Sequence, residues 1–208
     1  MLKYKTVVVG MMQSNCHVIY NENTAEAVIF DPGDESHRII KTVDSLNLKP
    51  CCVILTHGHF DHISATDEIC SYYNIGLLIN INDKDLLQNP SYNLSIAFMH
   101  NGITVDTKNV EYVSDEKRNI IGEEFEFITT PGHTNGSMCI KVSDILVTGD
   151  TLFYMSIGNA FPPFGDMYKE ITSIKSKILT LKGDYVCLTG HGQSTRLSYE
   201  KNNNQYLR

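Results

Sequence analysis

One short stretch, residues 56–62, constrains what this chain can fold into more than any other. Its sequence is THGHFDH, so three histidines and one aspartate fall within six consecutive positions. The apolar run 51–55 precedes it and predicts a buried strand, while the apolar spacing after it predicts a helix over 63–73. A polar cluster between a strand and a helix is typical of a functional site in an α/β protein. Imidazole and carboxylate together are good ligands for zinc, iron or manganese.

The spacing within this stretch favours two adjacent metal ions. His57 and His59 alternate in an extended segment, so their side chains can point the same way. Asp61 and His62 lie in the following turn and can point toward a neighbouring spot. A histidine near a turn is more often a surface or hydrogen-bonded residue, but a helix-capping loop rarely needs three imidazoles.

Three further strand ends carry a histidine or an aspartate beside glycine. They are His133, Asp150 and His191, and each follows an apolar run that predicts a strand. Glycine at these points permits a close approach of the backbone. Together with the stretch 56–62, these residues favour a metal centre. The other histidines lack this context and are expected to be structural or surface residues: His17, His37 and His100.

Hydrophobic patterning predicts an α/β chain with two similar halves. Strands are expected at 4–10, 16–20 and 27–30 as an antiparallel meander, and then at 51–55, 77–79, 125–129, 138–142, 145–148 and 185–188. Helices are expected at 36–47, at 63–73, from an Asp166 cap through Ile178, and from Glu200 to a frayed end at Arg208. The segment 83–124 is hard to interpret, although Asp83 can cap a short helix there. Two sheets packed face to face with helices outside satisfy this order.

Composition narrows the class of protein. The chain has 208 residues, which suits one domain with a substantial core. A net charge of −7 argues against nucleic-acid binding through a basic surface. We see no signal-peptide core and no apolar run that could span a bilayer, so we expect a cytoplasmic protein without a membrane partner. The six cysteines form no C-x-x-C pair and are expected to be small buried residues in a reducing compartment.

The ligand-type residues, taken in order, resemble the signature of the metallo-β-lactamase superfamily. The resemblance covers nearly the whole chain and implies an αββα sandwich, with 1–208 as a single domain. It also implies two divalent ions, zinc first, with iron or manganese as alternatives. By this resemblance His57, His59 and His133 bind one ion, Asp61, His62 and His191 bind the second, and Asp150 bridges the two.

Within the superfamily the chain resembles the glyoxalase II-like hydrolases, which cleave thioesters such as S-lactoylglutathione. The similar motifs are Asn15-Cys16, Asp31-Pro32-Gly33, PGHTNGS at 131–137 and GDTLF at 149–153. The resemblance implies that a hydroxide attacks a carbonyl carbon. Asp61 is then both a metal ligand and the catalytic residue that orients the hydroxide or transfers its proton.

Two departures weaken the assignment to glutathione thioesters. Only seventeen residues follow His191, so we expect no C-terminal helical domain of the kind that helps bind glutathione. Asn159 stands where the family usually has a basic residue, and an amide cannot supply charge-assisted binding of a carboxylate. Tyr154, Asn159 and Phe161 are candidate substrate contacts, although packing beneath the loop explains the two aromatic residues equally well.

The leading hypothesis is a dinuclear metal hydrolase that acts on a small thioester or a related acyl substrate. One alternative is a mononuclear iron dioxygenase of a persulfide, using His57, His133 and Asp150; the intact second ligand set favours the hydrolase. Another is a lactone or β-lactam hydrolase, although the missing signal peptide argues against a secreted resistance enzyme. The last alternative is a scaffold that binds a metal ion or a partner without catalysis. The complete ligand set argues against this alternative. The oligomeric state is left open.

Overall fold

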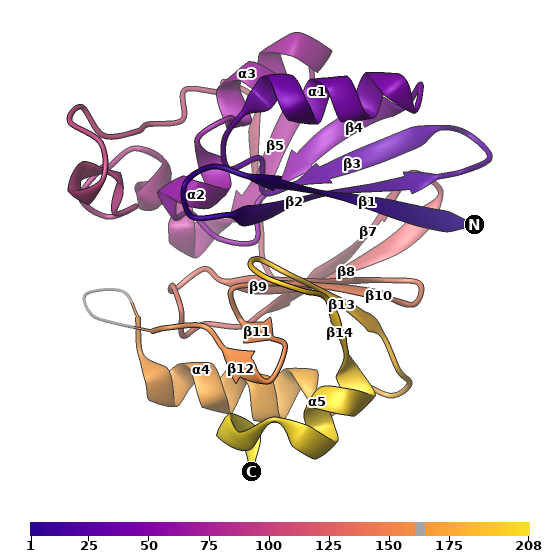
Figure 1. Ribbon diagram of the computed structural model, residues 1–208, viewed down its shortest axis with the longest axis vertical. Coiled ribbons are helices and arrows are strands. Elements are labelled where there is room, and N and C mark those ends of the chain that lie inside the picture. Colours follow the sequence, from indigo (N-terminus) through magenta and orange to yellow (C-terminus); the bar gives the residue numbers. More distant parts are fainter. Residues whose placement is uncertain (161–164) are drawn as a thin grey trace.

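Two β-sheets pack face to face, and helices cover the outer face of each sheet (Figure 1). The computed structural model describes residues 1–160 and 165–208. The indigo-to-magenta part of the chain builds one sheet with its helices, and the later part, ending in orange and yellow, builds the other. The predicted αββα sandwich of two similar halves is therefore confirmed.

The first half contributes a six-stranded sheet whose strands follow one another in chain order. The strands are β1 (Leu2–Val9), β2 (Ser14–Asn21), β3 (Glu26–Phe30), β4 (Lys49–Ile54), β5 (Gly76–Asn80) and β6 (Val110–Val113). The helices are α1 (Ser36–Ser45), α2 (Phe60–Ile63) and α3 (Thr66–Tyr73), with 3₁₀ turns at Ile81–Leu87 and Ser95–Ala97. The first three strands form the expected antiparallel meander, and β3 to β6 run parallel.

The second half builds its own six-stranded sheet. The strands are β7 (Glu116–Ile120), β8 (Glu123–Thr129), β9 (Met138–Val142), β10 (Ile145–Gly149), β13 (Val186–Thr189) and β14 (Thr195–Arg196), and β11 (Leu152–Phe153) pairs with β12 (Ser156–Ile157) in a separate hairpin. Across the sheet the order is β14-β13-β10-β9-β8-β7. The helices are α4 (Met167–Ser173), which continues as a π-helical turn over Ile174–Ile178, and α5 (Leu197–Asn203), followed by a 3₁₀ turn at Gln205–Leu207. No helix in the described parts of the chain is long and apolar enough to cross a bilayer.

Three apolar layers hold the sandwich together. Between the sheets, Phe30 from the first half packs in one cluster with Phe125 and Phe127 from the second. A second cluster joins the first sheet to its helices, and a third joins the second sheet to α4 and α5. In α1, Ile39 and Val43 stand four residues apart and are both buried, because this spacing places them on one face of a helix. Each such side chain stabilises the fold by about 2 kcal/mol when it leaves water.

The structure corrects two local predictions in the first half. The helix expected over 63–73 is divided into α2 and α3, because the Ala65 N–H donates to the Pro32 carbonyl at 2.9 Å and Ala65 is not helical. Asp83 does not cap the turn that contains it. Asn80 does so by accepting from the Asn82 N–H, and Asp83 is buried elsewhere.

The other corrections concern surface elements. Strands β6 and β7 lie inside the segment 83–124, for which the sequence gives no clear prediction. Charged residues such as Lys117 and Arg118 occupy the edge strand β7, so it lacks the apolar pattern by which a strand is predicted. Helix α5 begins at Leu197, before the predicted start at Glu200. Glu200 is buried and accepts hydrogen bonds from the Thr195 hydroxyl and the Met155 N–H, so the helix is packed at this point. It ends at Asn203, and the last residues of the chain are mostly exposed. Cys51 is exposed, whereas the other cysteines are buried as expected.

His17 is a structural residue, as expected, and it makes stability sensitive to acid. Its Nε2 donates to the Thr189 carbonyl at 3.0 Å, and its Nδ1 lies 2.9 Å from the Thr6 hydroxyl. Burial lowers the pKa of His17 to about 4. As the pH falls from about 6.5 toward 4, His17 binds a proton in the unfolded chain but not in the folded chain. The free energy of unfolding therefore decreases over this pH range.

We therefore expect the free energy of unfolding to fall by about 2 kcal/mol more between pH 7 and pH 5 in the unmodified protein than in His17→Gln. Urea denaturation at the two pH values measures this difference. Equal falls in both proteins would show that His17 is not held neutral.

Candidate metal centre

Strand ends from both halves meet at one edge of the sandwich. His57 and His59 lie in the loop between β4 and α2, and that helix then carries Asp61 and His62. From the second half, β10 and β13 run parallel, so the residues after them, Asp150 and His191, lie side by side. His133 reaches the same place from the loop after β8. The structure thus brings together all seven ligand-type residues that the sequence singles out.

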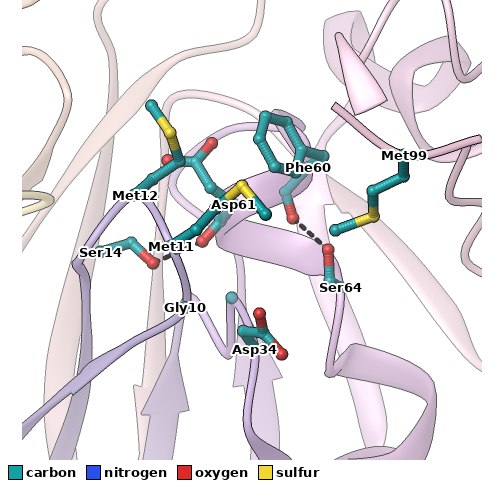
Figure 2. Close-up of a pocket in the computed structure, with 10 residues that line it drawn as sticks. Gly10, Met11, Met12, Ser14, Asp34, Phe60, Asp61, Ser64 and Met99 are labelled. Carbon is teal, nitrogen blue, oxygen red and sulfur yellow. Dashed lines mark hydrogen bonds between the residues drawn. The ribbon is translucent and has the colours of Figure 1, made fainter. Parts of the chain in front are cut away.

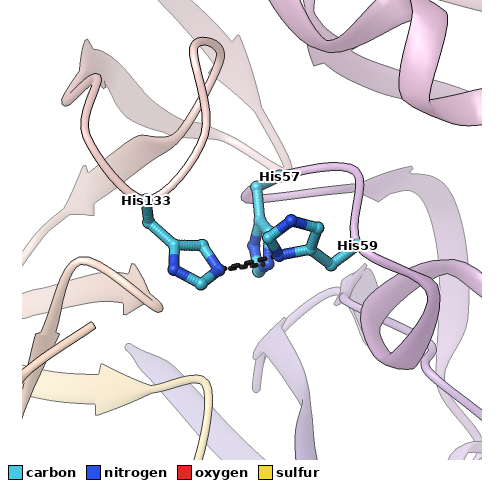
Figure 3. A group of neighbouring side chains, drawn as sticks. All are labelled: His57, His59 and His133. Carbon is cyan, nitrogen blue, oxygen red and sulfur yellow. Dashed lines mark hydrogen bonds between the residues drawn. The ribbon is translucent and has the colours of Figure 1, made fainter. Parts of the chain in front are cut away.

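Three imidazoles converge in the first group (Figure 3). The Nε2 atom of His133 lies 2.8 Å from His59 Nδ1 and 3.2 Å from His57 Nε2. His133 Nδ1 donates to the Asn159 carbonyl at 2.7 Å, so its Nε2 presents a lone pair. Burial lowers the pKa of His59 to about 3 and also lowers that of His133. These imidazoles are therefore neutral, which is the form that binds a metal ion.

The second group combines a carboxylate with two imidazoles. Asp61 Oδ2 lies 3.2 Å from His191 Nε2 and 3.5 Å from His62 Nε2, and the two imidazole nitrogens are 3.3 Å apart. Burial opposes a charge on His62, but Asp61 and Asp150 outweigh it and raise the pKa of His62 to about 9. The carboxylates thus require positive charge at this point, which protons or a metal cation can supply.

Asp150 connects the two groups. Its Oδ2 lies 3.5 Å from His133 Nε2 and 3.4 Å from His191 Nε2, while its Oδ1 lies 3.4 Å from His62 Nε2. The buried Oδ1 makes no hydrogen bond within the described residues. A buried acceptor without a donor is costly unless a cation satisfies it. The converging lone pairs and this carboxylate fit two neighbouring divalent ions with mixed nitrogen and oxygen ligands.

The sequence also matches a known family. The model of the metallo-beta-lactamase superfamily covers residues 9–191, from the end of β1 to the last histidine of the site. The chain belongs to the metallo-beta-lactamase superfamily.

Two relatives that match over nearly the full length of the chain are named as hydrolases. The chain is 34% identical over 210 residues to the probable metallo-hydrolase YqgX of Bacillus subtilis, covering 99% of this chain and 98% of that protein. It is 30% identical over 212 residues to the hydroxyacylglutathione hydrolase GloC of Haemophilus influenzae, again covering 99% and 98%. The chain is accordingly a metallo-hydrolase of the superfamily.

Solved structures show the same fold. The BLEG-1 B3 metallo-beta-lactamase is similar with a TM-score of 0.94 and 32% identity, over 99% of both chains. TTHA1623, solved in a di-iron-bound form, is similar with a TM-score of 0.84 and 25% identity, over 98% of this chain and 100% of that one.

In this metallo-hydrolase Asp31 orients the site, a role that sequence reasoning missed. Its Oδ1 accepts from the Thr56 N–H at 2.7 Å, and its Oδ2 accepts from the Thr56 hydroxyl at 2.7 Å and from His62 Nδ1 at 3.0 Å. The Thr56 hydroxyl in turn lies 3.1 Å from His57 Nδ1. Asp31 also lies within metal-binding distance of His57 and His62, but its oxygens are already occupied. It therefore fixes which ring nitrogen of each histidine faces the site.

Asp31→Asn is expected to weaken metal binding about 10- to 100-fold, the usual cost of losing an outer partner of a ligand. The side-chain amide of the variant places N–H donors opposite the donors of His62 and Thr56. These groups can no longer hydrogen-bond as they do to the carboxylate, so His62 loses its fixed orientation. Competition with a chelator measures the dissociation constant. The exposed carboxylate Asp85 offers a control, since Asp85→Asn leaves the site intact. Unchanged metal affinity in Asp31→Asn would remove Asp31 from this role.

Two other buried acids hold the histidine loops, and neither was recognised from the sequence. Asp83 Oδ2 accepts from the Gly58 N–H at 3.0 Å and from the Thr134 hydroxyl at 2.7 Å, and its Oδ1 accepts from the Gly136 N–H at 2.7 Å. It thereby ties the loop of residues 56–62 to the loop that carries His133. The only available signal was an acid in a partly apolar turn, which predicts a cap more readily than a buried acceptor.

Glu170 of α4 supports the same loop from the other side. Its Oε2 accepts from the His133 N–H at 2.6 Å, and its side chain is buried. Gly132 makes this approach possible, because a Cβ there would lie 2.1 Å from Glu170 Oε2. Gly190 plays the same part beside Asp150, where a Cβ would lie 2.0 Å from Oδ1. The prediction of close backbone approach at these glycines is thus explained by the carboxylates packed against them.

The three candidate substrate contacts have different positions. Tyr154 is exposed and stacks on Tyr199 with ring centroids 5.5 Å apart. Asn159 contributes its carbonyl to His133, and its side chain is exposed. Phe161 lies outside the described residues. A role for these side chains in binding substrate stays a prediction.

Proposed function

We propose that this metallo-hydrolase cleaves a small thioester or a related acyl substrate with two divalent ions bound. In this proposal the first ion is held by His57, His59 and His133, the second by Asp61, His62 and His191, and Asp150 is shared. The observation that carries the proposal is the position of the Asp150 carboxylate, which lies within 3.5 Å of imidazoles from both groups. Zinc is the first candidate for both ions, and the di-iron-bound form of TTHA1623 makes iron the alternative.

The chain's own residues supply a proton acceptor beside the site. When bound, two divalent ions supply hydroxide near neutral pH and offset the charge that develops on the carbonyl oxygen. Burial opposes ionisation of Asp61, but His62 and His191 outweigh it and hold the pKa of Asp61 below its usual range. Its ionised carboxylate can orient the attacking water and accept its proton. As the new C–O bond forms and the C–S bond breaks, that proton can pass to the departing thiolate.

The likeness to GloC supports a thioester substrate, because that relative is named a hydroxyacylglutathione hydrolase. This likeness does not support glutathione as the thiol part of the substrate. Asn159 is exposed and uncharged where the glyoxalase II-like hydrolases usually present a basic residue. A β-lactam is the second candidate, since the similarity to the BLEG-1 B3 metallo-beta-lactamase spans 99% of both chains at 32% identity.

The first experiment is elemental analysis of protein purified without added metal, combined with three assays. The substrates are S-lactoylglutathione, a neutral acetyl thioester and a chromogenic cephalosporin. We expect about two ions per chain and turnover of a thioester that a chelator abolishes and added zinc restores. A single iron, with oxygen uptake on glutathione persulfide and no hydrolysis, would replace this proposal with the dioxygenase. Turnover of the cephalosporin alone would replace it with the lactamase.

A further inference from the structure

The loop after β13 carries His191, and the first half of the chain holds this loop in place. Strand β13 ends at Thr189, and the residues after it turn to bring His191 to the site. Thr189 and Gly190 are buried, so their carbonyl groups need hydrogen-bond donors in place of a strand partner. These donors come from Asn15 near the start of β2, which lies 174 positions before Thr189 in the chain.

Asn15 supplies three donors to the loop. Its side-chain Nδ2 donates to the Thr189 carbonyl at 2.8 Å and to the Gly192 carbonyl at 2.9 Å. Its backbone N–H donates to the Gly190 carbonyl at 2.7 Å. Asn15 is 3% exposed, so solvent has little access to these bonds. One residue therefore fixes the backbone on both sides of His191.

The backbone and the ring of His191 are held as well. The His191 carbonyl accepts from the Thr189 hydroxyl at 2.9 Å. His191 Nδ1 donates to the Met12 carbonyl at 3.1 Å, and Met12 lies in the turn that leads to Asn15. The other ring nitrogen, Nε2, then faces Asp61 at 3.2 Å. The turn between β1 and β2 thus decides which nitrogen His191 presents to the second ligand group.

The same turn contacts the second ligand group at another point. Ser14, next to Asn15, donates its hydroxyl to the Asp61 carbonyl at 2.6 Å. Figure 2 shows Met12 and Ser14 beside Asp61. Asp61 and His191 come from different halves of the chain, and both are therefore tied to one short turn.

The chemistry of this contact suits asparagine. A side-chain amide offers two N–H groups on one nitrogen, whereas an ionised aspartate offers none and a serine hydroxyl offers one. Asn15 uses both N–H groups on carbonyls that flank His191. This gives a physical reason for the asparagine of the Asn15-Cys16 motif.

We infer that Asn15 is a positioning residue that holds His191 for the second metal ion and thereby sets the affinity of that ion. This inference rests on the two-ion arrangement of the proposed function. Asn15 acts through His191. Because Asn15 belongs to the first sheet and His191 follows a strand of the second, binding of the second ion depends on the packing of the two halves against each other.

Zinc affinity of the full chain tests the inference, measured by competition with a chromogenic chelator after the metal has been removed. Asn15→Ala is expected to weaken binding of one ion about 10- to 100-fold and to leave the other within about twofold. Asn15→Ser keeps one donor and is expected to fall between Asn15→Ala and the unmodified protein. Unchanged affinity for both ions in Asn15→Ala would overturn the inference.

Asn204→Ala is the matched control for a purely structural loss. Asn204 is 1% exposed, and its amide also donates two hydrogen bonds, to the Ser156 carbonyl at 3.0 Å and to Glu200 at 2.9 Å. Both alanine variants are expected to lower the midpoint of urea denaturation of the metal-free protein to a similar extent. Asn204→Ala is expected to keep both zinc affinities, and an equal loss of affinity in the two variants would contradict a positioning role.

A double-mutant cycle with His191→Ala shows whether Asn15 acts through this ligand. His191→Ala is expected to weaken binding of the same ion that Asn15→Ala affects. Adding Asn15→Ala to His191→Ala is expected to change the affinity for that ion by less than about twofold, because no imidazole remains to be positioned. Losses that multiply would show that Asn15 acts independently of His191 and would overturn the inference.

These affinities separate the inference from the proposed function. If Asn15→Ala shows the selective loss but the unmodified protein hydrolyses no thioester, the hydrolase proposal fails and the positioning role stands. If the unmodified protein hydrolyses a thioester with two ions bound and Asn15→Ala binds both ions equally tightly, the positioning role fails alone.

Discussion

Replacing Asp150 by asparagine is expected to lower kcat/KM for a thioester about 1,000-fold and to leave fewer than two ions bound per chain. The carboxylate lies among imidazoles of both groups, at 3.4 Å from His62 and His191 and at 3.5 Å from His133. Burial opposes its ionisation, but these histidines outweigh burial and hold the pKa of Asp150 well below its usual range. An amide of the same shape removes the negative charge that the two ions would share.

The measurements are elemental analysis and steady-state kinetics on the purified variant. Asp144→Asn is a matched control. Asp144 lies directly before β10 and Asp150 directly after it, but Asp144 is exposed to solvent. The control is expected to keep about two ions and full activity. Thermal unfolding in the presence of a chelator shows whether either variant has lost its fold independently of metal. An Asp150→Asn protein with two ions and kcat/KM within about tenfold of the original would show that this carboxylate is not shared.

Replacing Asp83 by alanine is expected to reduce the free energy of unfolding by about 3 kcal/mol. The change leaves two backbone donors in the protein interior without an acceptor, the N–H groups of Gly58 and Gly136. The Thr134 hydroxyl also loses an acceptor and keeps only the Ser137 hydroxyl, at 2.8 Å, as a side-chain partner. Burial raises the pKa of Asp83 to about 6 in spite of these bonds, so the comparison is made at pH 8, where the carboxylate is ionised. Urea denaturation of the metal-free protein measures the loss.

Asp85 provides the control, since it lies on the same 3₁₀ turn and is exposed. Asp85→Ala is expected to change the free energy of unfolding by no more than about 0.5 kcal/mol. Asp83→Ala is also expected to weaken metal binding, because the loops that carry His57 and His133 lose their common anchor. Equal stability of the two alanine variants would show that solvent, and not Asp83, satisfies these donors in the folded protein.

Local patterns were enough to locate most of the elements. Alternating or continuous apolar runs at 27–30, 125–129 and 138–142 predict strands because side-chain direction repeats every two residues, and the structure confirms them. The sequence does not reveal the edge strand β7, because charged and polar residues fill most of it and leave no apolar period. Helices α2 and α3 were merged because a hydrogen bond from Ala65 to Pro32, distant in sequence, interrupts an otherwise helical pattern.

The order of apolar strand and helix patterns in the sequence was enough to predict the sandwich. The seven ligand-type residues also stood out locally, because each lies in the polar stretch 56–62 or beside glycine after an apolar run. The tertiary structure alone decided how those residues are held. Asp31, Asp83 and Glu170 look like turn or surface acids in the sequence, and each acts on a histidine loop far along the chain. Partners of this kind depend on which strands and loops become neighbours on folding.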